Sequence, residues 1–241
     1  MTQTTRFIGA TLWILVGGAL AGGVYWGFLN TPESSVGSLV LSAVLVLLAL
    51  AVAGVTLNGA IGAWSGQPAL AVGRRALAHA AGIIPALVIV LLIWWIAGYA
   101  TGRVGLYSGE ISAWFIARFG REDISVLFTT ISWLTSWLRW VVAPLLALSL
   151  MASIGAAGWA SAWRATWLRA ALSPGRLVLS TLWFSALVAA PWVYLAPWRP
   201  RGLPATSVEI AFIAAKLLVT AVLMAMGLAL MIREVARKQA S

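Results

Sequence analysis

The sequence predicts an all-α, multi-pass membrane protein with six transmembrane helices and one amphipathic helical hairpin at the membrane surface. Three observations predict this class. Of the 241 residues, 62% are hydrophobic and only 9% are charged, whereas a soluble domain is nearer half apolar and a quarter charged. Several apolar runs reach the length of about 20 residues that crosses a hydrocarbon layer about 30 Å thick. The basic residues lie mostly in short connections between these runs.

The six apolar runs form a single transmembrane domain over residues 1–241. The predicted spans are 7–29, 36–64, 79–100, 141–163, 177–198 and 207–232. "ALA" at 19–21 resembles a signal-peptide cleavage site, but the apolar run continues through "GGVYWGFL", so we expect a retained first span. Within it, Gly18 and Gly22 have the separation that allows two helices to approach closely. They predict a packing face, used either within the chain or by a partner.

The distribution of Lys and Arg predicts that both chain ends face the cytoplasm of a bacterial inner membrane. With the N-terminus inside, the inner segments carry nine basic residues: Arg6, Arg74, Arg75, Arg164, Arg169, Arg176, Arg233, Arg237 and Lys238. The outer segments carry six: Arg103, Arg118, Arg121, Arg139, Arg199 and Arg201. This excess is the bias expected of cytoplasmic loops. The strong preference for Arg over Lys, with many Ala, Gly and Trp, indicates a GC-rich bacterial source.

Two inner connections, residues 65–82 and 163–176, mix small apolar residues with arginines. Each predicts a short basic helix lying on the inner leaflet. Such helices contact anionic lipid, and a well-placed basic residue contributes about 1 kcal/mol. The residues expected to do so are Arg74, Arg75, Arg164, Arg169 and Arg176. Lipid is therefore the expected partner of the net charge of +10, and nucleic acid is not.

The stretch "GAWSGQPALAVGRRALAHAAGIIPAL", residues 62–87, resembles the membrane domain attached to some glycerophosphodiester phosphodiesterases. That family has repeated spans and basic amphipathic linkers, so the resemblance implies a helical membrane fold. The 241 residues contain no phosphodiesterase catalytic domain, and the resemblance therefore carries no catalytic residue over to this chain.

No residue set predicts an active site, and we do not expect an enzyme. The chain has no cysteine and a single histidine, His79, which excludes thiolate sites and multi-histidine metal clusters. It also has no Gly-rich phosphate loop, so the chain cannot hydrolyse ATP to drive transport. The sequence implies no metal and no cofactor.

Lys216 lies within the sixth span, where an ammonium group costs at least about 2.5–3.5 kcal/mol on insertion scales. Glu209, Lys216 and Thr220 share one helical face because of their spacing of seven and four. One interpretation is an ion, proton or anionic-substrate site. The other is a structural contact to backbone carbonyl groups.

Residues 105–140 predict the outer hairpin. Gly120 is expected to end its first helix and Asp123 to cap the second. Trp133, Trp137 and Trp140 form one stripe of the second helix. With Trp114 of the first helix they predict either a plain interfacial anchor or a docking surface for another subunit, a lipid tail or a pigment.

Two functions follow. The first is an accessory or scaffold subunit of an inner-membrane assembly, which contacts partners through the Trp-rich hairpin and the Gly18 and Gly22 face. The alternative is a six-span permease component, ion-coupled or paired with a separate ATPase, which uses the Glu209, Lys216 and Thr220 face. A membrane enzyme is the weakest of the three classes considered.

Overall fold

The computed structural model describes residues 2–32, 35–120, 125–195, 197–198 and 206–236. This part of the chain is helical, and six of its helices are long and apolar enough to cross a membrane. They are α1 (Gln3–Leu29), α2 (Val36–Trp64), α4 with its preceding 3-10 turn η1 (Ala80–Gly82, Ile83–Leu106), the continuous helix Ser125–Ala157, α9 with two π-helical turns (Pro174–Leu195), and α10 (Thr206–Ala236). The prediction of an all-α, multi-pass membrane fold with six spans is confirmed.

Shorter helices connect the spans. The first basic connection forms α3 (Ala69–Ala78) and the second forms a 3-10 helix η3 (Trp159–Trp163) followed by α8 (Thr166–Ala171). Between α4 and the next span lies α5 (Ser108–Phe119), which ends at Gly120 with a φ of 62°. This left-handed C-terminal residue was predicted, and glycine adopts that conformation without a Cβ penalty.

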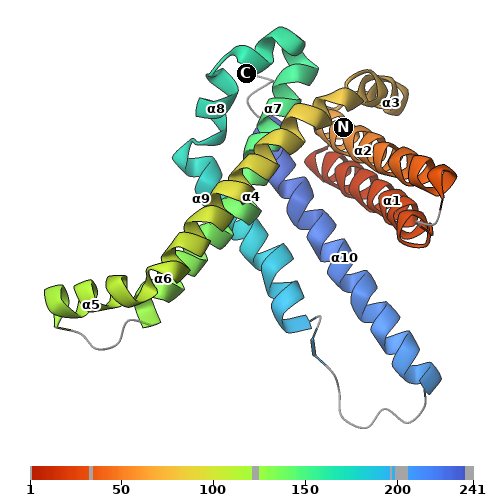
Figure 1. Ribbon diagram of the computed structural model, residues 1–241. Coiled ribbons are helices and arrows are strands. Elements are labelled where there is room, and N and C mark those ends of the chain that lie inside the picture. The colour runs from red at the N-terminus through yellow and green to blue at the C-terminus, as the bar shows by residue number, and fades with distance from the viewer. Residues whose placement is uncertain (1, 33–34, 121–124, 196, 199–205, 237–241) are drawn as a thin grey trace.

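The long helices converge at one end and diverge at the other (Figure 1). The first residues of α1, the helices α3 and α8, and the last residues of α10 lie together at the upper end in that view. We call this the inner end, because the sequence predicts that it faces the cytoplasm. Helix α5 and the first turns of α10 lie at the opposite, outer end. Antiparallel pairs form between α1 and α2, between α4 and α7 (Ala143–Ala157), and between α9 and α10.

The hydrophobic core lies in the inner half of the molecule. Helix α7 is its centre, since Leu145, Met151 and Ile154 are fully buried. Ile61 of α2 and Ile232 of α10 pack into the same region. The outer halves of the spans leave their large apolar side chains exposed, as a surrounding lipid phase permits. The fold is thus closely packed at its inner end and spread apart at its outer end.

The fourth span differs from its predicted bounds. Helix α6 (Ser125–Trp137) runs through the π-helical segment Leu138–Val142 into α7 without a break. The two hairpin helices exist, as α5 and α6, but the second is the beginning of a 33-residue span and not a separate arm. At 1.5 Å per residue this span is about 50 Å long, which exceeds the hydrocarbon thickness. Its other end is at Ala157, because Gly158 has a φ of 75° and stops the helix before the predicted residue 163.

Some predictions fall on residues outside the described ranges. Asp123, expected to cap the second hairpin helix, is one of them. The others are Arg121, Arg199, Arg201, Arg237 and Lys238 of the charge count.

Candidate functional site

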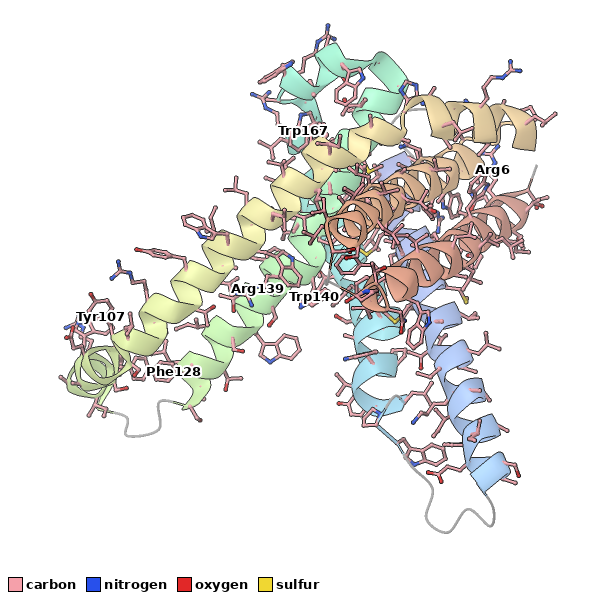
Figure 2. The ribbon with its side chains drawn as sticks, turned by 45° about the vertical axis from the view of Figure 1, so that its right-hand side comes forward. Arg6, Tyr107, Phe128, Arg139, Trp140 and Trp167 are labelled. Carbon is pink, nitrogen blue, oxygen red and sulfur yellow. The ribbon has the colours of Figure 1, made fainter. Side chains whose placement is uncertain are left out.

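The outer parts of α4 and α6, together with α5, form an arm that extends from the bundle. We call the described residues 94–120 and 125–142 the outer arm. It points away from α9 and α10, with Tyr107 and Phe128 toward its far end (Figures 1 and 2). The arm is two helices wide, because α4 and α6 run antiparallel and α5 lies at their tip. Two helices bury few side chains between them, so most of the arm's surface is exposed.

At the base of the arm, a cluster of Trp94, Arg139 and Trp140 joins α4 to the fourth span. The Trp94 indole nitrogen donates a 3.2 Å hydrogen bond to the Arg139 carbonyl oxygen. The Trp94 and Trp140 rings meet edge to face, with centroids 4.8 Å apart. The Arg139 guanidinium lies 5.8 Å from the Trp94 ring centroid, a cation–π distance. A Cβ atom at Gly98 would lie 3.2 Å from this guanidinium, so the glycine makes room for the charge.

This cluster coincides with the π-helical segment Leu138–Val142. Such a segment inserts one extra residue into a helix and is often found at functional sites. The Arg139 side chain of this segment lies beside Trp94 and Gly98 of α4. The Arg139 Nε atom is buried and has no hydrogen-bond partner among the described residues. The sequence predicts Arg139 on the outer side, at the end of the surface hairpin, and the structure places it within the span Ser125–Ala157 beside Trp94.

The four predicted contact tryptophans divide into two pairs. Trp137 donates a 2.8 Å hydrogen bond to the Thr181 hydroxyl and so ties α6 to α9. Trp140 packs on Trp94 and is half exposed. Trp114 and Trp133 point outward, with exposed fractions of 62% and 72%. Only the second pair is wholly available to a partner.

The predicted glycine face of α1 is open. Gly18 and Gly22 are exposed, and a Cβ atom at either would meet nothing within 4 Å. The close approach of α1 to α2 depends instead on Gly17, which lies against the Thr56 side chain. Packing within the chain therefore does not use Gly18 and Gly22, and their role toward a partner stays a prediction.

Lys216 makes a structural contact in α10. Its Nζ atom donates a 3.1 Å hydrogen bond to the carbonyl oxygen of Trp198 and lies 5.8 Å from the Phe212 ring. The Thr220 hydroxyl is buried and bonds within α10 to the Lys216 carbonyl oxygen at 2.9 Å. Glu209 is half-buried on the same helix. The backbone-carbonyl contact that the sequence left open for Lys216 is thus present.

The five predicted lipid-contacting arginines lie at the inner end, in three environments. Arg74 and Arg164 are exposed on the connecting segments. Arg75 donates a 2.6 Å hydrogen bond to the Gly155 carbonyl oxygen near the end of α7. Arg169 and Arg176 line one cavity, and Arg176 also donates to the Ala170 carbonyl oxygen at 2.8 Å. Arg75 therefore ties α3 to the end of α7, and the contact of these arginines with anionic lipid stays a prediction.

Sequence reasoning did not single out Trp94, Thr181 or Ser149, which contribute to the arm junction, the tie to α9 and the inner cavity. Each is an ordinary residue of an apolar span, and its contribution depends on where the other helices lie. Asn58 is a buried polar residue of α2. Its side-chain amide bridges the carbonyl oxygens of Gly54 and His79 at 3.0 and 3.1 Å.

Within the described ranges, no three His, Cys, Asp or Glu side chains form a group that could hold a metal ion. Comparison of the chain with known protein families, curated proteins and solved structures found no match. The resemblance of residues 62–87 to a phosphodiesterase-linked membrane domain therefore gains no support from the family comparison.

Proposed function

We propose that this multi-pass membrane protein is a scaffold or accessory subunit that binds another membrane protein along the outer arm. The observation that carries the proposal is a stripe of exposed side chains: Thr129, Trp133 and Ser136 on α6, continued by the half-exposed Trp140 of the π-helical segment. Their spacing of four, three and four puts them on one face of the helix. The stripe looks away from the bundle core, which ends at the π-helical segment.

The chemistry of this stripe suits a helix of another protein better than lipid tails. Hydroxyl groups of Ser and Thr hydrogen-bond between helices in membranes, and the alternative is an unpaired polar group in hydrocarbon. The Trp133 indole and the Ser136 hydroxyl form no hydrogen bond with any residue that the structure describes. A tryptophan is also a frequent energetic centre of protein interfaces.

Site-specific photocrosslinking in the native membrane tests this proposal. A photoreactive residue in place of Trp133 is expected to form an adduct with one protein. The matched control replaces Trp163, which is 93% exposed at the inner end and lies outside the arm. It is expected to give no adduct with that protein. Mass spectrometry of the adduct identifies the partner.

A second experiment measures retention of the same partner. Trp133→Ala is expected to release it during purification in mild detergent, whereas Trp163→Ala retains it. Trp133 makes no packing contact in the core, so the variant should keep its stability. The proposal fails if position 133 crosslinks only to lipid and the chain elutes as a lone monomer.

A further inference from the structure

At the inner end, far from the outer arm, an open cavity of about 460 Å³ lies between α7, α8, α9 and α10. Its space comes from small residues on α7: Ser149, Ala152, Ser153 and Ala156 follow the spacing of one helical face. Trp167 of α8 borders it at the inner end (Figure 2).

Two guanidinium groups lie at this cavity. Arg176 is held in place by its 2.8 Å bond to the Ala170 carbonyl oxygen and interacts electrostatically with Glu234. Arg169 is exposed and makes no hydrogen bond or ion pair within the described ranges. Glu234 is the one acidic residue on the predicted inner side. It offsets a single arginine, so the site keeps a net positive charge.

A buried hydroxyl group marks the deep side of the cavity. Ser149 is only 4% exposed, lines the cavity, and its Oγ atom has no hydrogen-bond partner among the described residues. Leaving such a group unpaired is unfavourable, because the hydroxyl has lost its water without gaining a protein partner. Ser149 precedes Ala157 at the inner end of α7 by eight residues, or about 12 Å along the helix. Polar groups are therefore available both at the membrane surface and below it.

We propose that this cavity binds a phosphate-bearing anion, with the phosphate at Arg169 and Arg176. Guanidinium groups match phosphate oxygens with paired N–H donors. The apolar alanine walls and the buried Ser149 hydroxyl fit the glycerol and first acyl carbons of an anionic phospholipid. Free phosphate shares the headgroup chemistry but would leave the deep side of the cavity unfilled. This is a defined site, distinct from the general attraction of a basic surface to anionic lipid.

Native mass spectrometry of the full chain, released from nanodiscs, tests the site. From phosphatidylglycerol nanodiscs we expect one retained lipid per chain, and none from phosphatidylcholine nanodiscs. Arg169→Gln is expected to weaken retention about tenfold, as suits the loss of a charge-assisted hydrogen bond. Arg164→Gln is the matched control, because Arg164 is exposed on the same connection and does not line the cavity.

Two further variants separate binding from folding. Ser149→Ala removes the buried hydroxyl without adding volume, and Ala156→Leu fills the cavity from an exposed position. Both are expected to lower lipid retention while the chain remains monodisperse. Equal loss of lipid in Arg169→Gln and Arg164→Gln would overturn the proposal in favour of surface attraction. If millimolar inorganic phosphate displaces the lipid and saturates the site itself, the ligand is soluble phosphate and the lipid assignment fails.

Discussion

The indole nitrogen of Trp64 in α2 donates a 2.9 Å hydrogen bond to the carbonyl oxygen of Ala229 in α10, across 165 residues of sequence. The Trp64 ring is 8% exposed and lies 6.3 Å from the Phe7 ring of α1. The guanidinium of Arg233 lies 5.9 Å from the same ring on its α10 side. One tryptophan thus joins the first, second and last described spans at the inner end.

Replacing Trp64 by Phe should lower the stability of the folded chain. The variant loses the bond to Ala229, worth about 1 kcal/mol, and leaves a buried carbonyl group without that donor. We expect a lower midpoint of thermal unfolding in detergent, followed by circular dichroism. Trp163→Phe is the control, since Trp163 is exposed and should show no change. Equal midpoints for the two variants would contradict this role of Trp64.

The same substitution should destabilise the fold at Gly17 and leave its stability almost unchanged at Gly18. A Cβ atom at Gly17 collides with the Thr56 side chain, so Gly17→Leu forces α1 away from α2. We expect a destabilisation of about 1–3 kcal/mol, typical of overpacking. Gly18→Leu meets open space and should change stability by less than about 0.5 kcal/mol. If Gly18 and Gly22 bind a partner, Gly18→Leu lowers co-purification of that partner without changing the unfolding midpoint.

Arg74 and Arg75 are adjacent, but only the substitution of Arg75 should lower the stability of the fold. Arg75→Gln removes the 2.6 Å bond to the Gly155 carbonyl oxygen at the C-terminal end of α7, where a positive charge also favours the helix dipole. The expected loss is about 1.5–3 kcal/mol, the range for bonds to charged groups. Arg74→Gln should leave the unfolding midpoint unchanged. A similar small effect of both variants would mean that the bond contributes no net stability.

Lys216→Met separates the structural interpretation from transport. The contact with the Trp198 carbonyl oxygen predicts lower stability in this variant. The permease alternative predicts a different result, namely loss of ion or proton flux in proteoliposomes by a chain that stays folded. Thr220→Val is the control variant, because the Thr220 hydroxyl bonds only to the Lys216 carbonyl oxygen of its own helix. Flux in the wild type that disappears in Lys216→Met would favour the permease over the scaffold.

The orientation can be measured directly because the chain has no cysteine. Ser65→Cys, between α2 and α3, should be labelled by a membrane-impermeant maleimide only after the cells are lysed. Ala113→Cys, exposed on α5, should be labelled on intact spheroplasts, where the outer side is accessible. This pattern follows from the excess of basic residues in the inner segments. The reverse labelling would place the chain ends on the opposite side.

The spans were predictable because lipid requires long apolar helices, and a run of about 20 apolar residues can be recognised in the local sequence. The bounds of α2 agree with the prediction at both ends, where Ser35 caps the helix and Ser65 follows it. The sequence did not predict that α6 continues into α7. Arg139 was assigned to the outer side and residues 105–140 to a surface hairpin, whereas the structure has one helix from Ser125 to Ala157.

Contacts between spans could not be read from local patterns. Trp133 and Trp137 lie in the same stripe of the predicted hairpin helix. In the structure, however, Trp137 bonds to Thr181 and Trp133 faces outward. What distinguishes them is the position of α9, which no local signal determines. The same holds for the inner cavity, whose lining comes from four helices.

The bond between Trp64 and Ala229 can form only late in biosynthesis, because its two residues are 165 positions apart. At about 5–20 residues per second, the ribosome needs roughly 8–33 s to proceed from one residue to the other. During this interval the α1–α2 pair can insert and pack, but the face of α2 that contacts α10 stays without that contact. Insertion of α10 therefore completes the core in one late step. In a chain that stalls before this step, the Trp64 indole and the side of the α1–α2 pair that packs on α10 remain uncovered.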